Sequence, residues 1–267
     1  MKIALGFIAS LVMTLLSCGA GVQEITFKRA QPLGQKSTYS MKNTVRSQPS
    51  PELAPIELLA DATIETEVTS AQPNGNWTLT TRYTSIDLKI DGKSQPDQAA
   101  PLAGKSFSVV MDREGKVLDV TGSDAPMAGL DLKQLASQMN PEAMLPASRV
   151  RIGETWPINT SSDIEMAGGA MHQIIKGTGT LRSANAGQAI VDFDLDFALS
   201  MAGAPGMNLN GSGKGKSSMT YDLDKARAIS NKSDSTIEMT AEFKSGSQTQ
   251  QTRSKVSISY QIDLIDK

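Results

Sequence analysis

The chain has 267 residues and a formal net charge of −2 at pH 7, and its residues are 39% hydrophobic, 20% charged and only 4% aromatic. This nearly balanced charge, without a basic patch of interleaved aromatic residues, argues against a nucleic-acid partner. One cysteine and one histidine exclude a disulfide within the chain and leave no His-rich zinc site to assemble.

Residues 1–17 predict an export signal, because Lys2 precedes an apolar run that is too short to span a membrane comfortably. The sequence Leu15-Leu16-Ser17-Cys18 resembles the lipobox of bacterial lipoproteins, whose cysteine is lipidated and becomes the first residue of the mature protein. The resemblance implies a permanent tether at Cys18, since stable anchoring takes at least two acyl chains and these lipoproteins carry three. Gly19, in place of an aspartate, implies sorting to the outer membrane with the domain in the periplasm. The alternatives are an ordinary signal peptide with an incidental cysteine, or an uncleaved anchor.

Residues 18–35 show little pattern and predict a lipidated N-terminus and spacer, whereas residues 36–267 predict a single antiparallel β domain. From Ser37 onward, apolar and polar residues alternate with a period of two, which is typical of half-buried strands with one face in water. Strands are expected at 36–46, 57–70, 76–90, 104–112, 116–122, 150–159, 170–183, 188–201, 208–223, 228–243 and 256–264. Turn-forming sequences separate several of them, at Pro73–Asn76, Asp91–Gly92, Asp112–Gly115 and Asn185–Gly187.

One short helix is expected from Asp131 to about Met139, with Asp131 as its cap and Pro141 after its end. The sequences on the two sides of this helix resemble each other, which predicts an internal duplication with repeats at about 36–122 and 150–243. Chance alignment of two amphipathic β segments is the alternative.

The stretch NGSGKGKSS at 210–218 looks like a phosphate-binding loop, but Asn210 stands where a Walker A loop needs its first glycine. A hairpin with strand 188–201, centred on Ala204, explains the alternating glycines better. This register places Met201 opposite Met207, Leu199 opposite Leu209, Phe197, Leu195 and Phe193 opposite Gly211, Gly213 and Gly215, and Asp192 and Asp194 opposite Lys216 and Lys214. A one-residue slip would destroy both the apolar and the charged pairs. We hypothesise that the glycines give the sheet strong local curvature, or leave room for large side chains or a ligand against bare backbone.

About eleven strands, several of them long, predict an all-β fold: a strongly curved antiparallel sheet like half a barrel, with the short helix between two similar halves. This outline is similar to the curled half-barrels of periplasmic lipoprotein carriers and receptors, whose concave face holds acyl chains. The segment VRIGETWPI at Val150–Ile158 carries a Gly-x-x-Trp element after the expected helix and resembles a family of uncharacterised bacterial lipoproteins. These relatives have no known activity, so the resemblance implies fold and location only.

The predicted function is that of a non-catalytic, membrane-anchored lipoprotein of the bacterial envelope that holds a lipid or acyl chain in its concave sheet. The candidate lining residues share one face of the hairpin and are Phe193, Leu195, Phe197, Leu199, Met201, Met207, Leu209, Gly211, Gly213 and Gly215. A structural or adaptor lipoprotein, which docks another envelope protein through a sheet edge or the concave face, is the alternative. No cofactor and no enzyme activity are expected, since the chain has no Gly-x-Ser-x-Gly element and no reactive cysteine once Cys18 is lipidated. A hydrolase built on a carboxylate pair is the third alternative.

Three further groups of residues have two interpretations each. Asp192, Asp194 and Asp196 are interpreted as a solvated strand face balanced by lysines, with calcium binding as the alternative. Trp77 and Trp156 are interpreted as core residues, with sugar stacking as the alternative. The third group comprises Met166, Met171, His172, Met201 and Met207. We interpret it as apolar core or cavity lining, with a Cu(I) site as the alternative.

Overall fold

The computed structural model of the chain describes residues 24–50, 52–122, 141–166, 169–202, 207–245 and 248–266. Its strands are β1 (Glu24–Ile25), β2 (Lys36–Gln48), β3 (Ile56–Ala71), β4 (Trp77–Ile90), β5 (Lys93–Ser94), β6 (Ser106–Met111), β7 (Val117–Thr121), β8 (Val150–Arg151), β9 (Thr155–Met166), β10 (Gly169–Asn185), β11 (Gln188–Ala202), β12 (Met207–Asp222), β13 (Arg227–Ser245) and β14 (Gln248–Leu264). A short helix α1 (Pro96–Ala99) and a 3₁₀ turn η1 (Pro141–Met144) complete the described elements.

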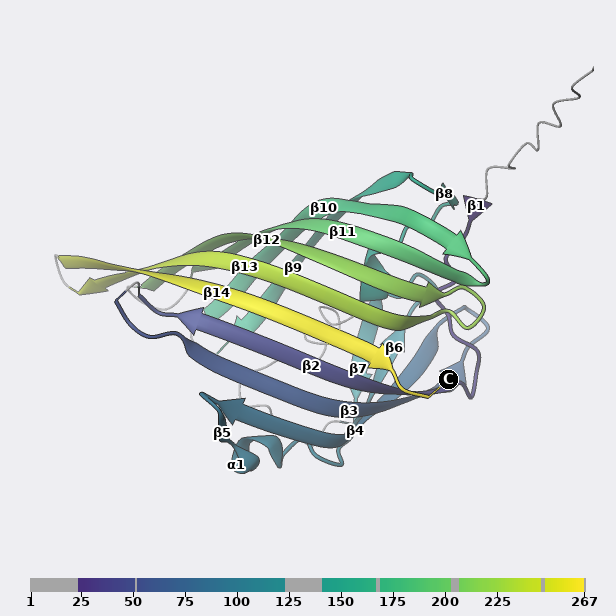
Figure 1. The fold of residues 1–267 in the computed structure, drawn as a ribbon, viewed down its shortest axis with the longest axis horizontal. Helices are drawn as coiled ribbons and strands as arrows, with labels where there is room; N and C mark the ends of the chain where they lie inside the picture. The colour runs from purple at the N-terminus through teal and green to yellow at the C-terminus, as the bar shows by residue number, and fades with distance from the viewer. Residues whose placement is uncertain are drawn as a thin grey trace, which may run out of the picture.

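Twelve strands form one antiparallel sheet in the order β7-β6-β4-β3-β2-β14-β13-β12-β11-β10-β9, with β5 beside β4. Almost every strand pairs with its neighbour in sequence, and β14 lies between β2 and β13, so it joins the two halves of the chain. In Figure 1 the sheet curls until β9 on one side and β6 and β7 on the other lie behind the central strands. The prediction of an all-β, strongly curved antiparallel sheet is therefore confirmed. The internal duplication stays a prediction.

Tight turns join the strands where the sequence places turn-forming residues. Asp91 and Gly92 have φ angles of 49° and 75°, and Ala186 and Gly187 have φ angles of 48° and 76°. Two consecutive residues with positive φ form the hairpin turn whose twist matches that of the flanking strands. These two predicted turns are confirmed.

The two faces of the sheet differ in chemistry. We call the face that carries Trp156, Phe193 and Tyr221 the inner face, and the face that carries Asp194 and Lys216 the outer face. The inner face is the concave face of the sheet. On this face, neighbouring strands approach each other so closely at two glycines that a side chain would not fit. A Cβ atom on Gly177 would collide with the main-chain oxygen of Asp194, and a Cβ atom on Gly213 would collide with that of Thr236.

Residues 24–35, which we call the strap, cross the inner face at one end of the sheet. Strand β1 pairs with β8 beside one edge, and the Phe27 ring packs edge-on against Tyr221 at 5.6 Å between centroids. Arg29 then donates hydrogen bonds to the main-chain oxygens of Leu145 and of Glu114 in the β6–β7 turn near the other edge. The prediction of a spacer over 18–35 is therefore wrong for its described part, because Ile25 and Phe27 of this segment belong to the core.

We call the end that holds the strap the strap end and the opposite end the far end. Strands β1 and β8 and the C-terminus all lie at the strap end in Figure 1, with β1 and β8 above and the C-terminus below in this view. Clusters of buried side chains fill the inner face there, and the largest includes Ile25, Phe27, Leu145, Val150, Trp156, Phe193 and Tyr221. The core is thus densest where the strap closes the curve of the sheet.

Two predicted elements differ from the structure. The expected strand 150–159 is divided into β8 and β9, because Gly153 adopts a φ of 86° and donates a hydrogen bond to the Leu181 oxygen at 2.7 Å. The helix expected from Asp131 to about Met139 lies outside the described residues. The helix α1, between β5 and β6, was not predicted.

The register of the β11–β12 hairpin is shifted by two residues from the prediction. The structure pairs Met201 with Leu209, Leu199 with Gly211, Phe197 with Gly213, Leu195 with Gly215 and Phe193 with Ser217. Alternation of polar and apolar residues determines which residues share a face, but a shift of two residues leaves the faces unchanged. The predicted pairs are therefore wrong, whereas the predicted division into two faces is confirmed.

Candidate ligand-binding surface

At the strap end the inner face is a solid core. The ring of Phe193 is 1% exposed and lies edge-on to Trp156 at 6.4 Å between centroids, and Phe27 packs against both Trp156 and Tyr221. Leu195 belongs to the same buried cluster. Of the candidate lining residues, Phe193 and Leu195 therefore pack within the core.

Both tryptophans are core residues, as interpreted from the sequence. The Trp156 indole lies over bare backbone at Gly179, where an added Cβ would come within 2.6 Å of Nε1. Trp156 Nε1 donates a hydrogen bond to the Met144 oxygen at 2.9 Å, and Trp77 Nε1 donates to the Asp112 oxygen at 3.1 Å. With both rings buried and both N–H groups bonded, neither ring offers a free face for a sugar.

Toward the far end the candidate lining continues along the inner face with a mixture of buried and half-buried residues. Leu199 and Met201 are buried, and Phe197 and Leu209 are half-buried. An ideal Cβ atom on Gly215 would lie 2.8 Å from the Phe197 ring, so this ring rests partly on bare backbone. The side chain of Met207 lies outside the described residues. On β11 and β12, the far half of the inner face is therefore apolar and less completely covered than the strap end.

Other strands contribute apolar side chains that the sequence prediction did not include. They lie on the inner face of β2, β3, β4, β10, β13 and β14, and each is half-buried: Val45, Leu58, Leu88, Ile175, Met239, Val256 and Ile258. Their alternation with polar neighbours is visible in the sequence. Their connection to the β11–β12 hairpin depends on the strand order, which the alternation does not specify.

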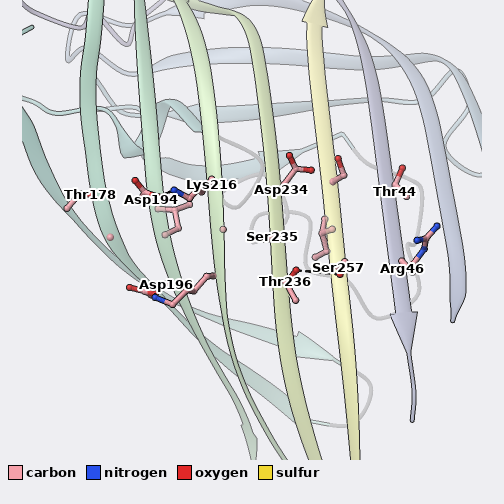
Figure 2. Close-up of a pocket in the computed structure, with 16 residues that line it drawn as sticks. Thr44, Arg46, Thr178, Asp194, Asp196, Lys216, Asp234, Ser235, Thr236 and Ser257 are labelled. Atoms are coloured by element: carbon pink, nitrogen blue, oxygen red, sulfur yellow. Dashed lines mark hydrogen bonds and ion pairs between the residues drawn. The ribbon is translucent and has the colours of Figure 1, made fainter. Parts of the chain in front are cut away.

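On the outer face, polar side chains form two rows that run across six strands, as Figure 2 shows. One row contains Thr178, Asp194, Lys216, Asp234, Ser259 and Thr44, and the other contains Asp196, Lys214, Thr236, Ser257 and Arg46. Between them lies a shallow groove of about 990 Å³, whose floor includes Gly177, Leu195, Gly215, Ser235 and Ile258. The groove follows from the spacing of side-chain rows on a twisted sheet, so its shape alone does not define a binding site.

The charges in these rows neutralise one another. Lys216 Nζ lies 2.9 Å from an Asp194 oxygen, and Lys214 Nζ lies 3.1 Å from an Asp196 oxygen. The predicted partners, Asp192 with Lys216 and Asp194 with Lys214, are therefore wrong by the same two-residue shift. The contact with Asp194 raises the pKa of Lys216. All four groups are largely exposed, as expected for a face in contact with water.

The described residues place the members of the two metal alternatives as follows. Asp192 contacts Arg182 at 3.2 Å and accepts a hydrogen bond from the Ser218 hydroxyl at 2.7 Å. Among the parts of the chain that the structure describes, no group of three or more His, Cys, Asp or Glu side chains is placed to hold a metal ion. Met171 pairs with Met201, whereas His172 is the next residue along β10, faces outward and contacts Asp163 at 2.6 Å. The predicted methionine and histidine group is therefore split between the two faces.

A buried polar cluster holds the strap end together. Glu142 is half-buried and accepts a hydrogen bond from the Ala228 N–H at 3.1 Å. Burial raises the pKa of Glu142 to about 7, although the Ala228 N–H and the nearby Arg29 act in the opposite direction. The Tyr221 hydroxyl donates a hydrogen bond to the main-chain oxygen of Lys28, which fixes the strap directly to β12.

Among the described residues, no helix combines the length and the apolar character needed to cross a membrane. No known protein family matches the chain, and no curated protein matches it either. The resemblance to lipoprotein families therefore stays a prediction.

Solved structures with some similarity are bacterial outer-membrane proteins. A loop L8 deletion mutant of OmpT from Vibrio cholerae is 7% identical with a TM-score of 0.20, covering 86% of this chain and 100% of that chain. OccK5 (OpdH) of Pseudomonas aeruginosa is 6% identical with a TM-score of 0.23, covering 88% of this chain and 99% of that one. A BenF-like porin from Pseudomonas fluorescens is 6% identical with a TM-score of 0.21, covering 87% and 100%. Scores this low carry no argument about the present chain.

Proposed function

We propose that this chain is a lipid-anchored, non-catalytic protein of the bacterial envelope that binds an apolar ligand, a lipid or an acyl chain, on the far half of its inner face. The observation that carries the proposal is the set of half-buried apolar side chains on the inner face of β2–β4 and β10–β14, where polar side chains such as Ser235 and Ser254 lie between some of them. Such surfaces bind ligands with long alkyl chains because binding removes apolar area from water, and they do not depend on directed polar contacts.

The inner face offers enough apolar surface for useful affinity. Each methylene group removed from water contributes about 0.8 kcal/mol, so burial of eight methylenes contributes about 6 kcal/mol before the entropic cost of association. Phe197 and Ile258 lie at the centre of the surface and are only half-buried in the protein alone. They retain apolar area that a ligand would remove from water.

The ligand proposal is tested by mass spectrometry of lipids released from the protein after purification from its own membranes. Phe197→Glu places a charge on the inner face, and Ala198→Glu places the same charge on the exposed outer face of the same strand. We expect wild type and Ala198→Glu to carry a stoichiometric lipid and Phe197→Glu to lose it. If folded Phe197→Glu, checked by circular dichroism, retains as much lipid as wild type, the proposal is wrong.

Anchoring is tested separately at the proposed lipobox. We expect the mature N-terminal peptide to begin at Cys18 with the mass of three attached acyl chains, and the Cys18→Ser variant to lose them. A mature protein that begins elsewhere, or carries an unmodified thiol, would contradict the proposed tether.

A second candidate function is an adaptor that docks another envelope protein. It rests on β9, a strand of twelve residues that ends the described sheet and has β10 as its sheet neighbour. Exposed strand edges accept a further strand from a partner. We would expect a stoichiometric protein partner whose binding is abolished when proline replaces Ser161 or Ser162, whereas the lipid content remains unchanged.

A further inference from the structure

The strap determines which end of the domain lies near the proposed lipid anchor. Its first described residue, Glu24, pairs with Arg151 of β8 at the strap end and contacts that guanidinium at 2.7 Å. Cys18 precedes Glu24 by six residues, and six residues extend at most about 22 Å in any conformation. A lipid on Cys18 would therefore hold the strap end within that distance of the membrane surface.

Three of the exposed large apolar side chains lie at the same end. Leu33 is 64% exposed, Ile152 48% and Ile265 55%, and these residues come from the strap, the β8–β9 turn and the segment after β14. Figure 1 shows β1, β8 and the C-terminus at this end of the sheet. Single exposed apolar residues are ordinary. Here the three come from separate places along the strap-end rim, Ile152 next to β1 and Ile265 next to the start of β2, so together they could meet a flat surface.

We propose that the strap end of this domain lies against a lipid surface, with Leu33, Ile152 and Ile265 inserted at the interface. The proposal rests on the proposed tether at Cys18 and adds an orientation to it. Exposed basic and acidic side chains are mixed along the same rim: Lys28, Arg113, Glu114, Glu154, Asp224 and Lys225. Apolar insertion rather than attraction to anionic lipid therefore stabilises the contact, and raising the salt concentration leaves it intact.

This orientation directs the far end away from the membrane. Strand β11 has fifteen residues, so at about 3.3 Å per residue it separates the two ends by up to about 50 Å. The half-buried apolar residues of the inner face then lie in the part of the domain that points away from the anchoring bilayer. A ligand would enter and leave from the aqueous side.

The orientation is tested on the full, lipidated chain with single cysteine substitutions, because the one natural cysteine is the proposed lipid attachment site. Leu33→Cys, Ile152→Cys and Ile265→Cys report on the strap end. Leu53→Cys and Ile56→Cys are matched controls at the far end, with wild-type exposures of 57% and 47%. Each variant is labelled with an environment-sensitive fluorophore and reconstituted into phosphatidylethanolamine–phosphatidylglycerol liposomes.

We expect the emission of probes at 33, 152 and 265 to shift to shorter wavelength and to be quenched by nitroxide-labelled lipid, while probes at 53 and 56 stay unchanged. If the protein floats with the liposomes but all five probes behave alike, the orientation is wrong and the tether stands. If the protein does not float with the liposomes, the tether is wrong and the orientation fails with it. Lipid content of the purified protein is measured independently and is unaffected by either result.

Discussion

Two inner-face glycines of β12, Gly211 and Gly213, differ in how much room a methyl group would have. At Gly213 an added Cβ would meet the Thr236 main-chain oxygen and lie 2.8 Å from the Ile237 Cα. At Gly211, two residues away on the same face, the nearest atom is Cγ of the flexible Met239 side chain at 3.1 Å. Gly213→Ala and Gly211→Ala are therefore a matched pair that separates backbone collision from loss of glycine as such.

The expected magnitudes follow from these contacts. Overpacking against structure that cannot yield costs about 1–3 kcal/mol, and replacing glycine with alanine recovers about 0.4–1 kcal/mol by restricting the unfolded chain. The collision at Gly213 is with backbone, which puts its cost at the upper end of the overpacking range, and after subtracting the gain we expect Gly213→Ala to lower the free energy of unfolding by about 2 kcal/mol. At Gly211 the methionine can move, so the two effects nearly cancel and we expect a change within about 0.5 kcal/mol.

Urea denaturation followed by circular dichroism measures both values, and thermal unfolding gives a second reading. For a domain of this size, 1 kcal/mol corresponds to about 2–4 °C in Tm. If both variants are as stable as the wild type, the conclusion that the close approach of β13 requires glycine at position 213 is wrong. Equal destabilisation of both would show that glycine itself, rather than the local collision, is needed along β12.

Two further predictions concern the strap end. Phe27→Ala should lower the free energy of unfolding by about 3 kcal/mol, because it empties the space between Trp156 and Tyr221. If urea denaturation shows a loss of less than about 1 kcal/mol, the conclusion that the strap is part of the core is wrong. Glu142 has a pKa of about 7 in the folded protein against 4.5 when unperturbed, so the folded state binds more protons between these values. Stability should therefore fall by about 3 kcal/mol as the pH rises through this window, and Glu142→Gln should flatten the dependence. Parallel pH profiles of the two proteins would contradict this assignment.

Strands and faces were predictable because the alternation in this chain is long. Fourteen residues from Gln188 to Met201 alternate with few exceptions, and β11 extends from Gln188 to Ala202. The register of the β11–β12 hairpin was harder to predict from the sequence. Phe193 and Leu195 lie opposite small residues in both the predicted and the observed alignment, and the two alignments keep the same faces.

The strap was missed because its signal is short. Ile25 and Phe27 alternate with Glu24, Thr26 and Lys28, which is a pattern of five residues and too little to separate a strand from chance. Its partners lie far away in the sequence: Phe27 contacts Tyr221, and Arg29 binds the oxygens of Glu114 and Leu145. The wider apolar lining was missed for the same reason, since it requires β14 to insert between β2 and β13.

The route of the strap also has a mechanical consequence. Any outward pull on Glu24 is opposed first by the two-residue pairing of β1 with β8 and by the Arg151 contact. Peeling then has to extract Phe27 from its ring contacts and detach Arg29 before force reaches the hydrogen-bond ladder between β2 and β3. Under such a pull, the strap would therefore yield in steps before the load reaches the large sheet.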